Sequence, residues 1–240
     1  MRRFIILAAV LCLASCDVFG DMWSAEDKSA KSSLDGNTLT YSTSSFTHTY
    51  TLEETELGAT VSFSAFPSGV QEFTEVQTRL LGKSKPGTLA LCIMAFEIYR
   101  RDRAAGESCI KKCNLSANAT ITMRRLKEKF PARRGATTDS YQQPYLVASY
   151  LKGATRANNY SPDKPYVIIL TLNDNPNVAQ GEYSTTYKGS VWHYYVSCNG
   201  DDRRDADVLE PDDNGLIMVH GCGNLVMSVP AVSDWKDTLE

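Results

Sequence analysis

The chain has 240 residues, with 25 lysines and arginines against 28 aspartates and glutamates, and its formal net charge is −3. This mildly acidic balance excludes a generic nucleic-acid-binding protein, which would need a strongly basic surface. The length is enough for one large domain or two small ones.

The first sixteen residues have the order of an export signal. Arg2 and Arg3 give a positive start, residues 4–13 are an unbroken apolar run, and Leu13-Ala14-Ser15-Cys16 follows. The apolar run is too short to span a bilayer as a helix, which takes about 20 residues. We therefore expect a secretory signal peptide over residues 1–15.

The Leu-Ala-Ser-Cys sequence resembles the lipobox of bacterial lipoproteins. The resemblance implies cleavage before Cys16, diacylglycerol on the Cys16 sulfur and a further acyl chain, such as palmitate, on the new amine. Such an anchor is effectively permanent. We expect a lipid-anchored protein of a bacterial cell membrane or outer membrane, with a bilayer as its first partner and its domain outside the cytoplasm.

After the anchor, residues 16–45 are rich in serine, threonine and charged side chains, which predicts a flexible tether. Phe46–Leu52 and Thr60–Phe66 alternate apolar with polar residues and predict a hairpin of two strands.

The apolar spacing changes to that of helices over residues 70–130. Residues 70–81 favour one amphipathic helix. Leu89–Ile98 are apolar on nearly every side, which is typical of a buried helix, and Pro86 suits its first turn. Shorter helices are expected around residues 109–113 and 119–130.

The C-terminal half favours strands separated by Pro, Gly, Asn and Asp. The expected strands are Tyr145–Tyr150, Tyr166–Leu172, Glu182–Lys188, Val191–Ser197, Leu216–His220 and Leu225–Val229. Strands, then helices, then strands predict a single α+β domain over residues 46–240, its helices packed on a mostly antiparallel sheet drawn from the C-terminal half.

Two stretches, Ala95–Gly106 and Ser149–Tyr166, resemble an uncharacterised bacterial family. The family pattern is S-Y-x-x-G-A-T-x-x-N-N-Y-x-P-x-x-P-Y, and the resemblance covers roughly residues 70–236. Leu151, Arg156 and Ser161 are mild departures from its usual form. The resemblance implies no function, because none is established for that family.

The same motif has a physical interpretation as a stiff connector. Gly153 permits a close turn, asparagines bond their own backbone, and the prolines fix φ. The alternative is a ligand-binding loop whose contacts would be Arg156, Asn158 and Tyr160.

Sequence motifs of common enzymes are absent: there is no G-x-S-x-G, H-E-x-x-H, P-loop or dinucleotide fingerprint. Of the three histidines, His193 and His220 could join Cys198 and Cys222 around zinc, but the spacing matches no known signature. The expectation is therefore no catalytic residue, no metal and no cofactor.

Five cysteines remain once Cys12 leaves with the signal and Cys16 is lipidated. Because five is odd, at least one thiol stays unpaired within the chain, and spacing alone does not give the connectivity. The five are Cys92, Cys109, Cys113, Cys198 and Cys222. Cys109 and Cys113 would share one helix face, and burial as thiols is the simplest interpretation.

Charge is segregated in two places. A basic segment with one acid, Glu128, holds Lys111, Lys112, Arg124, Arg125, Lys127, Lys129, Arg133 and Arg134. It is either a solvated helix face or a docking surface for anionic lipid, an anionic glycan or an acidic envelope protein. The acidic stretch 200–214 favours a solvated hairpin loop over a calcium site.

These features together predict an envelope lipoprotein with a binding or structural role. The alternative is an envelope hydrolase. A cleft that holds His193 or His220 within hydrogen-bond reach of a thiol, hydroxyl or carboxylate would favour the alternative.

Overall fold

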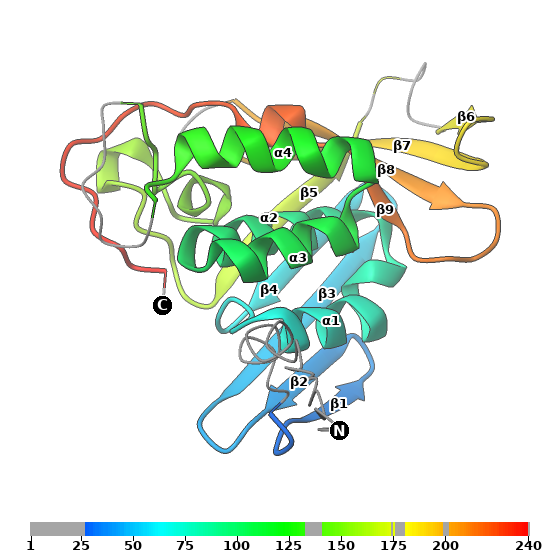
Figure 1. Ribbon diagram of the computed structural model, residues 1–240, viewed down its shortest axis with the longest axis horizontal. Helices are drawn as coiled ribbons and strands as arrows, with labels where there is room; N and C mark the ends of the chain where they lie inside the picture. The colour runs from blue at the N-terminus through cyan, green and yellow to red at the C-terminus, as the bar shows by residue number, and fades with distance from the viewer. Residues whose placement is uncertain (1–26, 133–140, 174, 176–180, 199–201, 240) are drawn as a thin grey trace, which may run out of the picture.

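The computed structural model describes residues 27–132, 141–173, 175, 181–198 and 202–239. In this part of the chain, α-helices lie together over one face of a mostly antiparallel, curled sheet (Figure 1). The α+β class expected from the sequence is confirmed.

The sheet runs in the order β1-β2-β3-β4-β5-β7-β8-β9, with β6 beside β7, and every strand pairing within the described residues is antiparallel. The strands are β1 (Lys31–Asp35), β2 (Thr38–Ser42), β3 (Thr47–Thr55), β4 (Gly58–Phe63), β5 (Tyr166–Leu172), β6 (Glu182–Ser184), β7 (Gly189–Val196), β8 (Arg204–Pro211) and β9 (Met218–Gly221).

The helices connect the two runs of strands. They are α1 (Val70–Arg79), α2 (Lys85–Arg101), α3 (Arg103–Cys113) and α4 (Ser116–Lys129), with 3-10 turns η2 (Leu81–Lys83), η3 (Ala148–Tyr150), η4 (Arg156–Asn158) and η5 (Gly223–Val226). The helices expected from the sequence are confirmed in place and order.

Helix α2 is the centre of the core, as its apolar sequence predicts. The Ser84 hydroxyl accepts a hydrogen bond from the Gly87 N–H and so caps its start. Phe96 is 0 % exposed, because α2 contacts β4, β5, β8 and β9 as well as α3. Gly106 of α3 permits the close approach, since a Cβ there would lie 2.1 Å from the Tyr99 Cα.

Part of the expected tether is ordered sheet. Residues 31–42 form β1 and β2, so the tether limit at residue 45 is wrong. Leu39 and Tyr41 alternate with threonines, and both side chains are buried. This two-residue period drives strand formation although the segment is hydrophilic overall. The hairpin expected next is confirmed as β3 and β4.

Three local predictions for the C-terminal half are wrong. Residues 145–150 form turns and η3 rather than a strand, and residues 223–226 form η5. Within the acidic stretch, residues 204–211 form β8 rather than a loop. In β8 the acids Asp205 and Asp207 alternate with buried Ala206 and Val208, so each carboxylate points away from the core.

Candidate functional site

The expected lipid attachment residue, Cys16, lies outside the described residues. The described chain enters the domain at Asp27, whose N–H donates to the Gln71 side chain of α1 over 2.8 Å. Across the described segments we find no helix with the length and hydropathy needed to cross a bilayer.

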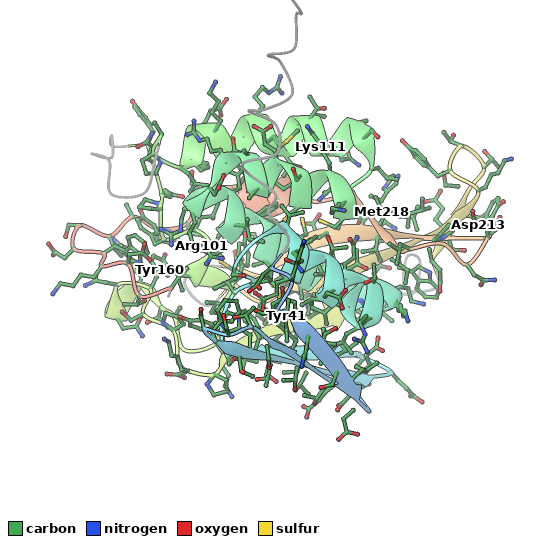
Figure 2. The ribbon with its side chains drawn as sticks, turned by 60° about the horizontal axis from the view of Figure 1, so that its bottom comes forward. Tyr41, Arg101, Lys111, Tyr160, Asp213 and Met218 are labelled. Carbon is green, nitrogen blue, oxygen red and sulfur yellow. The ribbon has the colours of Figure 1, made fainter. Side chains whose placement is uncertain are left out.

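The basic segment is divided by the structure into two sets. Lys111 and Lys112 lie exposed at the end of α3, and Arg124 and Lys127 lie exposed on α4. We call these four residues the basic helical surface. Figure 2 shows Lys111 at the edge of the helical layer that is far from Tyr41 of β2. Lysine and arginine near the ends of α3 and α4 also interact favourably with the negative helix termini.

The remaining described cations are held by the C-terminal segment. Arg125 donates to the Gly223 carbonyl at 2.9 Å, and Lys129 donates to the Ser228 hydroxyl at 2.6 Å. These two side chains join α4 to η5 and its continuation. Arg133 and Arg134 lie outside the described residues.

The two parts of the basic helical surface lie differently with respect to the point where the chain enters the domain. Arg124 and Lys127 belong to α4, whereas Lys112 lies beside α1, because the Gln77 side chain of α1 donates to the Lys112 carbonyl at 2.8 Å. Figure 1 shows α4 along one edge of the molecule and β1 and β2 toward the other, with α3 and α1 between them. Asp27, the first described residue, is bonded to Gln71 of α1 and not to α4.

The suggested ligand loop has a structural role instead. Tyr160 is 0 % exposed, its ring stacks on Tyr145 at 5.1 Å, and its hydroxyl donates to the Pro230 carbonyl. Asn158 closes a capping box with Thr155. The connector interpretation accounts for both side chains, and Arg156 at the start of η4 is exposed.

The four residues weighed as zinc ligands have separate partners. His220 packs edge-on against Tyr187, and Cys198 lies 3.5 Å from the Ser149 hydroxyl. Cys222 is buried beside Thr122 of α4. Searching the described residues for three or more His, Cys, Asp or Glu suited to one metal ion gives no such group.

His193 forms a pair with a carboxylate that sequence spacing did not indicate. Its Nδ1 lies 2.6 Å from Asp207 Oδ1, and the two side chains are 24 % and 29 % exposed. Antiparallel pairing of β7 with β8 places the two residues directly opposite each other. A histidine oriented by a carboxylate is the arrangement of a general base. Within the described residues, no serine, threonine or cysteine is bonded to the imidazole.

His48 belongs to a buried cluster between β3 and α1. Glu72 accepts hydrogen bonds from the Tyr50 hydroxyl at 2.7 Å and the Ser68 N–H at 2.7 Å, and His48 Nδ1 lies 2.8 Å away. Burial, and next the Glu72 charge, raise the pKa of Tyr50 well above its ordinary value. These three partners of Glu72 come from β3 and from the residues before α1, so the cluster fixes α1 on the sheet.

Comparison with known proteins gives one match. The sequence model of a family described as Domain of unknown function (DUF6935) matches residues 65–231. No curated protein and no solved structure matches the chain.

Proposed function

Because the chain belongs to the DUF6935 family, a domain of unknown function, we propose its role from its own residues: it is a lipid-anchored bacterial envelope protein that binds an anionic glycan. The observation that supports the anchor is Leu13-Ala14-Ser15-Cys16 after two arginines and an apolar run. The support for the ligand class is the basic helical surface.

The position of the α4 part of this surface, Arg124 and Lys127, favours a glycan over the bilayer that holds the anchor. Residues 17–26 separate Cys16 from Asp27, and such a stretch spans at most about 40 Å. A domain of this size is about 45 Å across, so a chain passing around it to the far side needs roughly 65 Å. We infer that Arg124 and Lys127 of α4 face away from the anchoring membrane, toward polymers of the surrounding envelope, whereas Lys112 lies beside α1, to which Asp27 is bonded.

Replacing Cys16 with Ala should release the protein from membranes or leave it as an uncleaved precursor. The physical reason is that no other apolar stretch of the sequence approaches 18 residues. The measurement is fractionation of cells after carbonate washing. Cys12→Ala, within the expected signal, is the matched control and should stay anchored. A processed Cys16→Ala protein that remains in the membrane after washing contradicts the lipid anchor.

Replacing the basic helical surface with glutamine should abolish binding to a polyuronate at low salt. The substitutions are Lys111→Gln, Lys112→Gln, Arg124→Gln and Lys127→Gln, which leave Arg125 and Lys129 on their structural partners. Exposed charges are screened beyond about 10 Å at 0.1 M salt, so binding by the natural chain should weaken steeply as salt rises. Sedimentation or calorimetry over a salt series measures both effects.

The control removes the same charge elsewhere. Lys28, Lys31, Lys152 and Lys236 are also exposed, and their replacement by Gln should leave polyuronate binding unchanged. Equal losses of polyuronate binding in both variants would show that binding depends only on the net charge of the protein. Binding to phosphatidylglycerol vesicles but not to the polyuronate would replace the glycan with lipid as the partner.

The His193–Asp207 pair supports a second candidate, an envelope hydrolase. The pair has the base and the orienting carboxylate of a hydrolytic site, exposed enough to meet a substrate. A panel of ester, amide and glycoside substrates separates the two candidates. Hydrolysis that is lost in His193→Gln, with unchanged thermal unfolding, would favour the hydrolase over the binding protein.

A further inference from the structure

Three thiols meet around one amide inside the helical layer. Cys92 lies in the middle of α2, Cys113 is the last residue of α3, and Cys222 follows β9. All three are buried, with 0, 0 and 2 % of their surfaces exposed. The side chain of Asn114 lies among them and is itself 1 % exposed.

The distances define a connected cluster. Asn114 Nδ2 donates toward Cys113 Sγ at 3.3 Å and toward Cys92 Sγ at 3.6 Å. Cys222 Sγ donates to Asn114 Oδ1 at 3.3 Å and lies 3.2 Å from the Thr122 hydroxyl. Cys92 Sγ also lies 3.9 Å from Asn114 Oδ1, the same oxygen that Cys222 contacts. The Asn114 amide thus places Cys92 close to both of the other thiols.

The environment disfavours thiolates. Burial raises the pKa of Cys92 well above its ordinary value, and the interaction with Cys92, followed by burial, does the same for Cys222. Thiol–disulfide exchange begins with a thiolate, so these sulfurs react slowly in the closed protein. Reaction during folding, or when the segment after β9 opens, is the accessible route.

We propose that Cys92 and Cys222 are a disulfide-forming pair that fastens the segment after β9 to α2, with Cys113 as the alternative partner of Cys92. Cys222 is favoured because it lies outside regular helix and can adjust to the narrow range of Cα separations a disulfide allows. Cys113 is less free, since the close contact of Gly106 with Tyr99 fixes α3 on α2.

The oxidant is an external disulfide, which the proposed export to the envelope would supply. The Cys222 thiolate attacks one sulfur of that disulfide, forms a mixed disulfide and releases the first thiolate. The Cys92 thiolate then attacks the Cys222 sulfur, closes the Cys92–Cys222 bond and releases the second. Two electrons pass to the external disulfide, and the two cysteine protons end on the two released thiols.

The test refolds the reduced, denatured chain in glutathione buffers of increasing oxidised fraction. Free thiols are then blocked and linked peptides are identified by mass spectrometry. We expect a Cys92–Cys222 link, with Cys109 and Cys198 still free. The melting temperature should rise by about 10 °C on oxidation, because the bond closes a long loop. In the Cys222→Ala variant the link should move to Cys92–Cys113.

Cys198→Ala is the matched control. Cys198 is a buried thiol outside the cluster, bonded to Ser149, and its loss should leave the Cys92–Cys222 link unchanged. The proposal would be overturned if Cys92, Cys113 and Cys222 all stayed free at every glutathione ratio, or if a link involved Cys109 or Cys198 in place of Cys92. Membrane attachment is measured separately, so failure here leaves the anchor untouched.

Discussion

A fragment limited to the matched family region, residues 65–231, should fail to fold cooperatively, whereas residues 27–240 should fold. The fragment lacks β1 to β4, and β4 pairs with β5 along six residues at the middle of the sheet. It also lacks Asp237, which pairs with Arg100 of α2 at 2.9 Å. Removal of β4 leaves the backbone groups along one edge of β5 unpaired, and unpaired edges of this kind promote aggregation.

The side chains lost with β2 to β4 bury enough apolar surface to decide whether the fragment folds. Five large buried apolar side chains of β2 to β4 belong to the same core as α2: Leu39, Tyr50, Leu52, Val61 and Phe63. Each contributes about 1.5–3 kcal/mol when buried. Together they amount to roughly 10 kcal/mol, which is comparable with the whole stability of a typical domain of about 5–15 kcal/mol.

Urea unfolding followed by tryptophan fluorescence and circular dichroism distinguishes the fragments. A fragment of residues 37–240 is the control, because it loses only β1, whose side chains are mostly exposed. It should unfold cooperatively at slightly lower urea. If residues 65–231 unfold with a single sharp transition of similar midpoint, the N-terminal strands are an accessory rather than part of the core.

The sequence predicted a helix or strand correctly where the apolar pattern of that element is confined to one segment of the chain. The apolar residues of α2 repeat within one segment, so its burial followed directly from periodicity. The alternation Thr38-Leu39-Thr40-Tyr41 carried the same kind of signal for β2, but the many hydroxyl residues around it favoured a tether. In β8, acids occupy the outward positions, so the segment has the composition of an acidic loop although its residues alternate as in an ordinary strand.

Short apolar runs led to the opposite error, in which a strand was predicted where the structure has a turn. Residues 145–150 have the composition of a buried strand, yet they form a buried turn in which the Tyr150 hydroxyl donates to the Leu225 carbonyl. Periodicity cannot separate these cases over six residues. The sequence could not predict the neighbours of the cysteines either, because Cys92 and Cys222 come close only through packing of α2 against the end of β9.

Replacing Arg100 with Met should lower the free energy of unfolding by about 3–5 kcal/mol near neutral pH, as expected when a buried charge loses its closest partner. Glu97 would keep only the more distant Arg101, whose Nε lies 3.6 Å from Oε1. Arg100 donates to both carboxylate oxygens of Glu97, at 2.6 and 2.8 Å. The two side chains are 3 % and 0 % exposed. Arg100 also donates to Asp237 at 2.9 and 3.0 Å, which holds the C-terminal segment against α2.

The loss should depend on pH. Burial raises the pKa of Glu97, and the hydrogen bonds and charge of Arg100 oppose this increase. Without Arg100, the folded-state pKa of Glu97 should rise further above that of the unfolded chain. A raised folded-state pKa adds stability below the unfolded pKa and loses it as pH rises through the folded pKa. The deficit of Arg100→Met should therefore be smaller at pH 5 than at pH 8.

Urea unfolding of the natural chain and the variants at both pH values measures this dependence. Adding Glu97→Gln to Arg100→Met removes the stranded charge, so the double variant should recover part of the loss and its pH dependence. Arg79→Met is the matched control. Arg79 pairs with Glu75 at 3.8 Å near the surface and donates to the Ser32 carbonyl at 2.9 Å, and the loss of these exposed interactions should cost roughly 1–2 kcal/mol. A deficit for Arg100→Met as small as that of Arg79→Met, or one that grows toward low pH, would show that Glu97 does not stay charged in the core and that packing around Trp235 and Asp237, rather than ion pairing, holds the C-terminal segment.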